Sequence, residues 1–211
     1  MNSKLAAAVA LVLGLAAPAG AGEAETIAEI RSVWSRCEAA VSGDPDAWTG
    51  WRRDHFNGYA DSFQYFNRQF HDNEPSVLVT RFDIDAIAVE INTYCFRPEG
   101  SLAFVYSEMS APNVAAGGEN GPWISREGRI YVDPAGEIVR ILGWITDDAG
   151  KKLGRLDDPG LMLARGCRAL DLYPDLAAVE AAYAAELGDI EGNRPAFTAQ
   201  TLDWCARARF D

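Results

Sequence analysis

The chain of 211 residues is poor in histidine and lacks the short motifs that identify common enzyme classes. It contains two histidines and none of the patterns G-x-S-x-G, H-E-x-x-H or a phosphate-binding glycine loop. Each of these motifs supplies the central chemistry of its class: a nucleophile, a zinc site or a phosphate cradle. Their absence argues against a serine hydrolase, a zinc protease and a nucleotide-binding P-loop protein.

Basic residues are scarce relative to acidic ones. The chain has 19 lysines and arginines against 31 aspartates and glutamates, which gives a net charge of −12 at pH 7. Nucleic acids and anionic lipid surfaces are held by basic side chains that neutralise phosphates. We therefore expect no nucleic-acid partner.

No apolar run after residue 21 is long enough to cross a bilayer, which requires roughly 20 residues. Before that point, Lys4 precedes an apolar run from Leu5 to Ala17, and the small residues Pro18-Ala19-Gly20-Ala21 follow. This order is typical of a cleaved secretory signal peptide. We expect residues 1–21 to be removed and the product to be exported, periplasmic or secreted, with no membrane insertion after cleavage.

The four cysteines occur without any C-x-x-C motif, which argues against a thioredoxin-like redox centre and a zinc knuckle. In an exported protein, cysteines usually form structural disulfides. Four cysteines allow three complete pairings. We favour Cys37–Cys95 and Cys167–Cys205, because each pair joins elements within one half of the chain. The paired acids at 147–148 and 157–158 fit solvated turns better than a calcium loop, so we expect neither a metal nor a cofactor.

Hydrophobic spacing predicts helices at the beginning of the mature chain. Thr26 and Glu29 fit a capping box, which satisfies backbone amides at a helix start. Apolar residues then recur every three or four positions, so we expect a helix over 26–42. Aromatic residues on the same spacing as His55 predict a second helix over 48–70, which two internal glycines weaken.

From residue 77 onward, apolar and more polar residues alternate, a pattern that predicts strands. Turn sequences rich in Gly, Pro and Asp separate these segments. The expected strand regions are 77–95, 102–109, 123–132 and 137–145, with a loop over 111–122. Both faces of 138–142 carry bulky apolar side chains, so we expect this strand to be covered on both sides.

A charged, glycine-rich stretch over 147–159 has no apolar period and marks the expected boundary between two parts. Helical spacing then returns. We expect helices over 161–170, over 176–187 and from 195 onward. The resulting organisation is an α+β domain over 22–150 and a helical C-terminal extension over 151–211, which the second disulfide would staple.

The segment Gly128–Asp133, with the sequence GRIYVD, runs into the second predicted hairpin. Together with the order of elements over 25–147, it resembles the nuclear-transport-factor-like superfamily, also described as the cystatin-like α+β cone. The resemblance implies N-terminal helices packed on a curved antiparallel sheet, with a pocket between sheet and helices. The acid/base set of the superfamily's enzymes does not map onto this sequence, so no site residue is carried over.

His55 is the titratable side chain of most interest, because it shares the predicted aromatic helix face with Trp51 and Tyr59. With Asp54 or a carboxylate of the sheet, it is a candidate general base. The alternative is a hydrogen-bonded histidine at the rim of a filled core. Trp144, near the end of a predicted strand, is a candidate for closing the same ligand-binding pocket or for sealing the sheet.

These features lead to a first hypothesis and two alternatives. We expect a non-catalytic exported protein that binds a small apolar molecule or an envelope protein, since flat apolar walls with few polar groups suit such ligands. The first alternative is a small pocket enzyme, a hydrolase or isomerase, that uses His55 with a nearby carboxylate. The second is a partner-binding module that acts through the helical tail.

Overall fold

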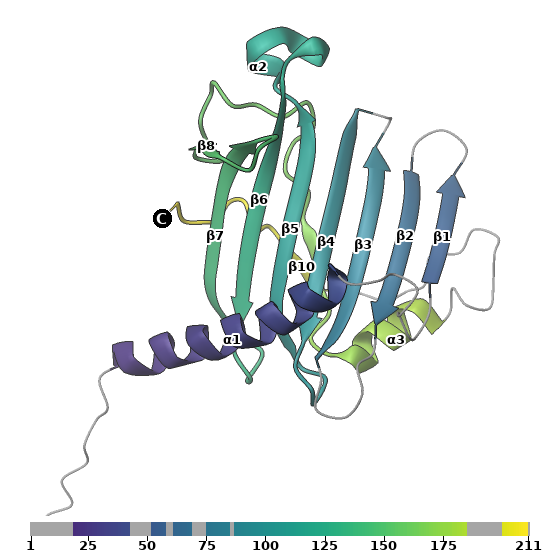
Figure 1. The fold of residues 1–211 in the computed structure, drawn as a ribbon, viewed down its shortest axis with the longest axis vertical. Helices are drawn as coiled ribbons and strands as arrows, with labels where there is room; N and C mark the ends of the chain where they lie inside the picture. Colours follow the sequence, from purple (N-terminus) through teal and green to yellow (C-terminus); the bar gives the residue numbers. More distant parts are fainter. Residues whose placement is uncertain are drawn as a thin grey trace, which may run out of the picture.

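The computed structural model describes residues 19–42, 52–57, 61–68, 75–84, 87–184 and 200–210. Within them the chain is an α+β protein with one long helix, α1 (Ala19–Val41), and one eight-stranded antiparallel sheet (Figure 1). Each strand pairs with the next along the chain, in the order β1 to β8. The strands are β1 (Arg52–Asn57), β2 (Asp61–Arg68), β3 (Ser76–Ile84), β4 (Ala88–Phe96), β5 (Leu102–Pro112), β6 (Trp123–Val132), β7 (Ile138–Asp147) and β8 (Lys152–Gly154).

Helix α1 crosses one face of this sheet (Figure 1). Its buried residues recur every three or four positions, as the sequence predicts, and pack against β3 to β7. The predicted capping box is wrong, because α1 begins earlier, at Ala19. Thr26 therefore lies inside the helix, where its hydroxyl donates to the carbonyl of Gly22 at 2.8 Å. Glu29 also lies inside α1, and its carboxylate pairs with a residue of the sheet region.

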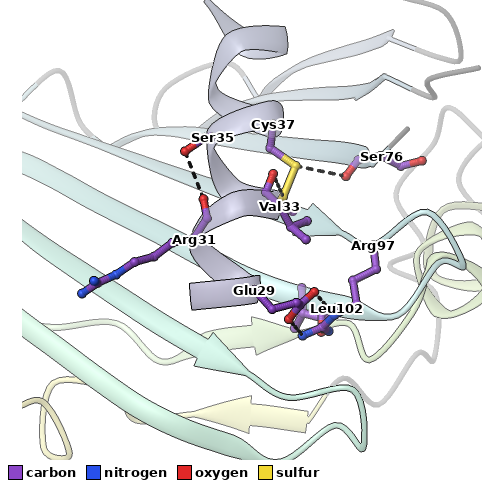
Figure 2. The surroundings of a disulfide bond; sticks show 9 residues. Glu29, Arg31, Val33, Ser35, Cys37, Ser76, Arg97 and Leu102 are labelled. Atoms are coloured by element: carbon purple, nitrogen blue, oxygen red, sulfur yellow. Dashed lines mark hydrogen bonds and ion pairs between the residues drawn. A yellow bond between two sulfur atoms is a disulfide. The ribbon is translucent and has the colours of Figure 1, made fainter. Parts of the chain in front are cut away.

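The partner of Glu29 is Arg97, which follows β4 and is only 3 % exposed. Its Nε and Nη2 donate to the two carboxylate oxygens of Glu29, each at 3.0 Å (Figure 2). The same guanidinium donates to the carbonyls of Leu102 at 2.7 Å and Val132 at 2.8 Å. One buried arginine thereby joins α1 to three strands at the end of the sheet.

We expect Glu29→Gln to lower the free energy of unfolding by about 1–2 kcal/mol, because hydrogen bonds to charged groups are worth roughly 1.5–3 kcal/mol and water screens part of this pair. Urea denaturation of both proteins would measure the difference. Glu23→Gln is the matched control: Glu23 pairs with Arg140 at 3.0 Å, but Glu23 is 50 % exposed and Arg140 is 32 % exposed rather than buried, so its loss should stay below about 0.5 kcal/mol. Equal losses in the two variants would contradict the prediction.

The C-terminal segment covers the opposite face of the sheet (Figure 1). It contains α3 (Leu176–Ala184) and the antiparallel pair of β9 (Leu170–Leu172) and β10 (Gln200–Leu202). Its apolar side chains share one cluster with residues of β3 to β7. Ile141 packs in that cluster and its neighbour Leu142 packs in the α1 cluster, which confirms that this strand is covered on both sides.

The predicted second helix over 48–70 is wrong: the described residues form the hairpin of β1 and β2. A spacing of four places residues on one face of a helix, but it does the same on a strand, whose period is two. The aromatic residues of this stretch favour strands, which decides the ambiguity.

The C-terminal part differs from the predicted helical extension. Residues 161–169 and 203–210 are not helical, and α3 is the one helix beyond residue 154 in the described part of the chain, where it confirms the start of the predicted helix over 176–187. The backbone of this part bonds to the body of the protein instead. Leu163 forms an isolated β-bridge with Asn113, and Arg209 forms one with Leu142. In these contacts, backbone groups that would pair with one another inside a helix pair with the rest of the protein instead.

Both favoured disulfides are present, with Cα atoms 6.0 Å apart in Cys37–Cys95 and 6.4 Å apart in Cys167–Cys205. In the described ranges, no helix is both long and apolar enough to cross a membrane. Residues 1–18 of the predicted signal peptide lie outside those ranges. The division at residue 150 and the cone-like curvature stay predictions.

Candidate functional site

Among the described residues, the predicted site is divided between β1 and β7. Asp54 and His55 are consecutive in β1, where they pair with Gln64 and Phe63 of β2. Trp144 lies on β7, with five strands between it and β1. At about 4.8 Å per strand, this places Trp144 roughly 29 Å from β1. Trp51 and Tyr59 lie outside the described residues.

Trp144 itself is 4 % exposed and belongs to the cluster under α1. The guanidinium of Arg129 lies 4.9 Å from the centre of its ring, and the Nζ of Lys152 lies 3.6 Å away. Two cations thus stack on the indole, an arrangement that stabilises the ring by cation–π attraction. This environment corresponds to the alternative in which Trp144 seals the sheet.

Polar residues also gather on the α1 face. Glu108 and Glu127 are directly opposite each other on β5 and β6, and both charges act on the hydroxyl of Tyr106. Burial first, and then the negative charge of both glutamates, raises the pKa of the Tyr106 hydroxyl. The phenol therefore stays protonated. No group of three or more His, Cys, Asp or Glu side chains within the described ranges is placed to hold a metal ion.

A cavity of about 330 Å³, partly open to solvent, lies on the other face of the sheet. It lies between β6 and β7 on one side and residues 156–167 on the other. Apolar side chains and the Cys167–Cys205 disulfide form much of its wall: the apolar residues include Ile145, Leu156, Leu161 and Leu163. The resemblance implied a pocket between sheet and N-terminal helices, whereas this cavity lies beneath the C-terminal segment.

Asn113, at the end of β5, fixes the outer wall of the cavity. Its Nδ2 donates to the carbonyl of Gly160 at 3.0 Å, and its Oδ1 accepts from the amide of Met162 at 3.2 Å. Backbone bonds from Val114 to Met162 and from Ala164 to Pro112 hold the same stretch. The disulfide anchors the other end. These bonds and the disulfide fix the wall relative to the sheet.

Arg126 of β6 lines the cavity and is 6 % exposed. Its Nη2 donates to the carbonyl of Gly166 at 3.2 Å and contacts the Sδ of Met109 at 2.8 Å. Its Nε has no hydrogen-bond partner among the described residues, and none of the ion pairs between them includes Arg126. Glu90 lies two strands away in the same cross-strand row and hydrogen-bonds to Asn92.

Burial lowers the pKa of Arg126, and the charge of Glu90 opposes that shift. An arginine nevertheless stays charged in proteins. The cavity wall thus holds a buried cation whose direct acceptors are one neutral carbonyl and one thioether sulfur. Such a group can attract an anion, because a buried charge is costly when it has no counter-charge.

Sequence reasoning missed this site. One signal was present: Ile124, Arg126, Gly128 and Ile130 alternate on one face of β6, and that face is buried. An arginine at a position where alternation demands an apolar side chain is a reason to suspect a binding role.

The fold and this cavity define an α+β protein whose antiparallel sheet is covered on both faces. No protein-family model matches the chain, no curated protein matches it, and no solved structure matches it.

Proposed function

We propose that this chain is an exported protein that binds a small apolar ligand without catalysing a reaction, and that the cavity beneath the C-terminal segment holds this ligand. The observation that carries the proposal is the cavity itself, about 330 Å³ in volume, whose walls combine aliphatic side chains, Met162 and a disulfide with four charged residues. Small-molecule sites typically measure about 300–1,000 Å³ and combine apolar walls with a few polar groups. A volume at the lower end of this range favours a ligand of medium length.

Export is part of the proposal. The leader pattern over 1–21 supports it, and so do the two disulfides, since such bonds persist in oxidising compartments. The enzyme alternative receives no support from this cavity. Its base, His55, belongs to β1, and four strands separate β1 from β6.

Calorimetric titration with 1-octanol tests the proposal. Wild-type protein should bind the alcohol, and Leu161→Trp should weaken binding at least about tenfold, because the larger ring fills space that the alkyl chain needs. Leu153→Trp is the matched control, since Leu153 is 42 % exposed and does not line the cavity. Thermal unfolding of both variants checks that they fold. A wild-type protein that binds no alcohol, or equal binding by Leu161→Trp, would refute the assignment.

A further inference from the structure

We propose that the ligand of this cavity carries an acidic head group, a carboxylate at one end of an apolar chain, and that Arg126 binds it. This inference rests on the proposed function and adds the chemical class of the ligand. It follows from the buried cation in the cavity wall, from its donor groups and from the distribution of charge around the cavity.

The positive charge of Arg126 is buried without an ion-pair partner in the described residues. Arg126 is more than nine-tenths buried. Its acceptors are neutral, and the buried carboxylate whose charge acts on it, Glu90, lies two strands away and forms no ion pair with it, so the positive charge is only partly balanced. A carboxylate in the cavity would supply the missing negative charge at the place where the protein lacks it.

The donor groups of Arg126 also favour a carboxylate. A guanidinium presents its donors as a planar fork that matches the two oxygens of a carboxylate. The Nε of Arg126 is a buried donor without a partner in the described part of the chain. Protein atoms cover Nε, so a carboxylate would bind at the part of Arg126 that lines the cavity, where it supplies the charge that a hydroxyl or a carbonyl lacks.

The acidic residues that line the cavity belong to its outer wall and not to the sheet. Asp157 is exposed and paired with Arg155 at 3.0 Å, and Asp158 accepts the amide of Gly160 at 2.8 Å. Both belong to the outer wall, whereas Arg126 belongs to the sheet. Arg165 is a second cation along the lining. The head group would therefore lie against β6, and the chain would extend past Leu156 and Leu161.

Octanoate and 1-octanol form the test pair, because they share the same chain and differ in charge. We expect wild-type protein to bind octanoate at least about tenfold more tightly than octanol, and acetate far more weakly than either. Arg126→Met keeps an apolar chain of similar length and removes the charge. This variant should bind octanoate about ten- to a hundredfold more weakly and octanol within about twofold of wild type.

Two further variants separate binding from structure. Arg129→Met removes an arginine of the same strand that does not line the cavity, and it should leave octanoate affinity unchanged. Arg126→Lys keeps the charge but loses the planar fork, so its affinity should fall between those of wild type and Arg126→Met. Arg126→Met should also unfold close to the wild-type temperature, since it removes the cost of burying this charge together with the attraction to Glu90.

The outcomes distinguish the two proposals. If wild-type protein binds neither octanoate nor octanol, the proposed function fails and this inference fails with it. If octanol binds as tightly as octanoate, the cavity is an apolar site and the acidic head group is wrong. If acetate binds as tightly as octanoate, Arg126 holds a small anion and the apolar chain plays no part. The wild-type comparison alone decides these points, even where a variant does not fold.

Discussion

Trp204→Ala is expected to lower the free energy of unfolding by about 3–5 kcal/mol, the range for truncating a large buried aromatic side chain. Trp204 is 2 % exposed and lies in the cluster that joins the C-terminal segment to the sheet. Its indole lies over Gly128 and Gly143, which are directly opposite each other on β6 and β7. The two glycines leave a gap in the layer of side chains, and the ring fills it. Urea denaturation of both proteins would measure the loss.

A double-mutant cycle tests this packing directly. A Cβ added at Gly128 would lie 2.6 Å from an atom of the Trp204 ring, so Gly128→Ala should cost about 1–3 kcal/mol in wild type. In the Trp204→Ala background the same change should cost much less, because the three atoms nearest to the added Cβ all belong to the Trp204 ring. Gly143→Ala should stay costly there, since its Cβ also meets Leu156 and Ala208. Gly117→Ala, with open space around it, is the neutral control. Additive costs at Gly128 would argue against the packing.

The part of the fold that the sequence predicts best is the run from β3 to β7. Alternating apolar residues set the faces of these strands, and turn residues such as those at 97–100 and 133–136 set their ends. Both signals are local, so they survive without knowledge of the rest of the chain. The disulfide pairing was also predicted, because each pair closes a loop within one half of the chain.

The errors share a physical cause: local patterns that two structures satisfy equally well. The aromatic spacing around His55 fits a helix and a strand alike. Thr26 and Glu29 fit a cap only if the helix begins there, and α1 begins at Ala19. In the C-terminal part, apolar residues such as Leu163 and Leu170 are spaced for a helix, yet each is buried against the sheet from an extended or looped backbone. Burial is satisfied either way, and only tertiary contacts choose.

The candidate site was harder to predict than the fold. Its floor is Arg126 on β6, and its outer wall is the stretch around Leu161, roughly 35 residues later in the chain. No periodicity links these positions. The contact arises because Asn113 binds the backbone of Gly160 and Met162, which is a property of the folded chain. The one local sign of the site is that Arg126 occupies a position of β6 where the alternation places buried side chains.

Removing the Cys37–Cys95 disulfide by substituting both cysteines with alanine is expected to cost about 4 kcal/mol, from the entropy of the longer unfolded loop. The bond closes a separation of 58 residues and ties α1 to β4. The Cys167–Cys205 bond closes 38 residues, so its removal should cost only a few tenths of a kcal/mol less by the same reasoning. Denaturant titrations of the oxidised protein and both double variants would compare them.

The two variants should differ in binding although their stabilities are similar. Cys167 and Cys205 line the cavity, whereas Cys37 of α1 and Cys95 of β4 are buried on the other face of the sheet. Loss of the Cys167–Cys205 bond frees one end of the cavity wall, so octanoate affinity should fall about tenfold or more at temperatures where the protein remains folded. Loss of the Cys37–Cys95 bond should leave octanoate affinity within about twofold of wild type, since α1 contributes nothing to the lining. Equal effects on binding would mean that the ligand is held elsewhere, or that the two faces of the sheet do not act independently.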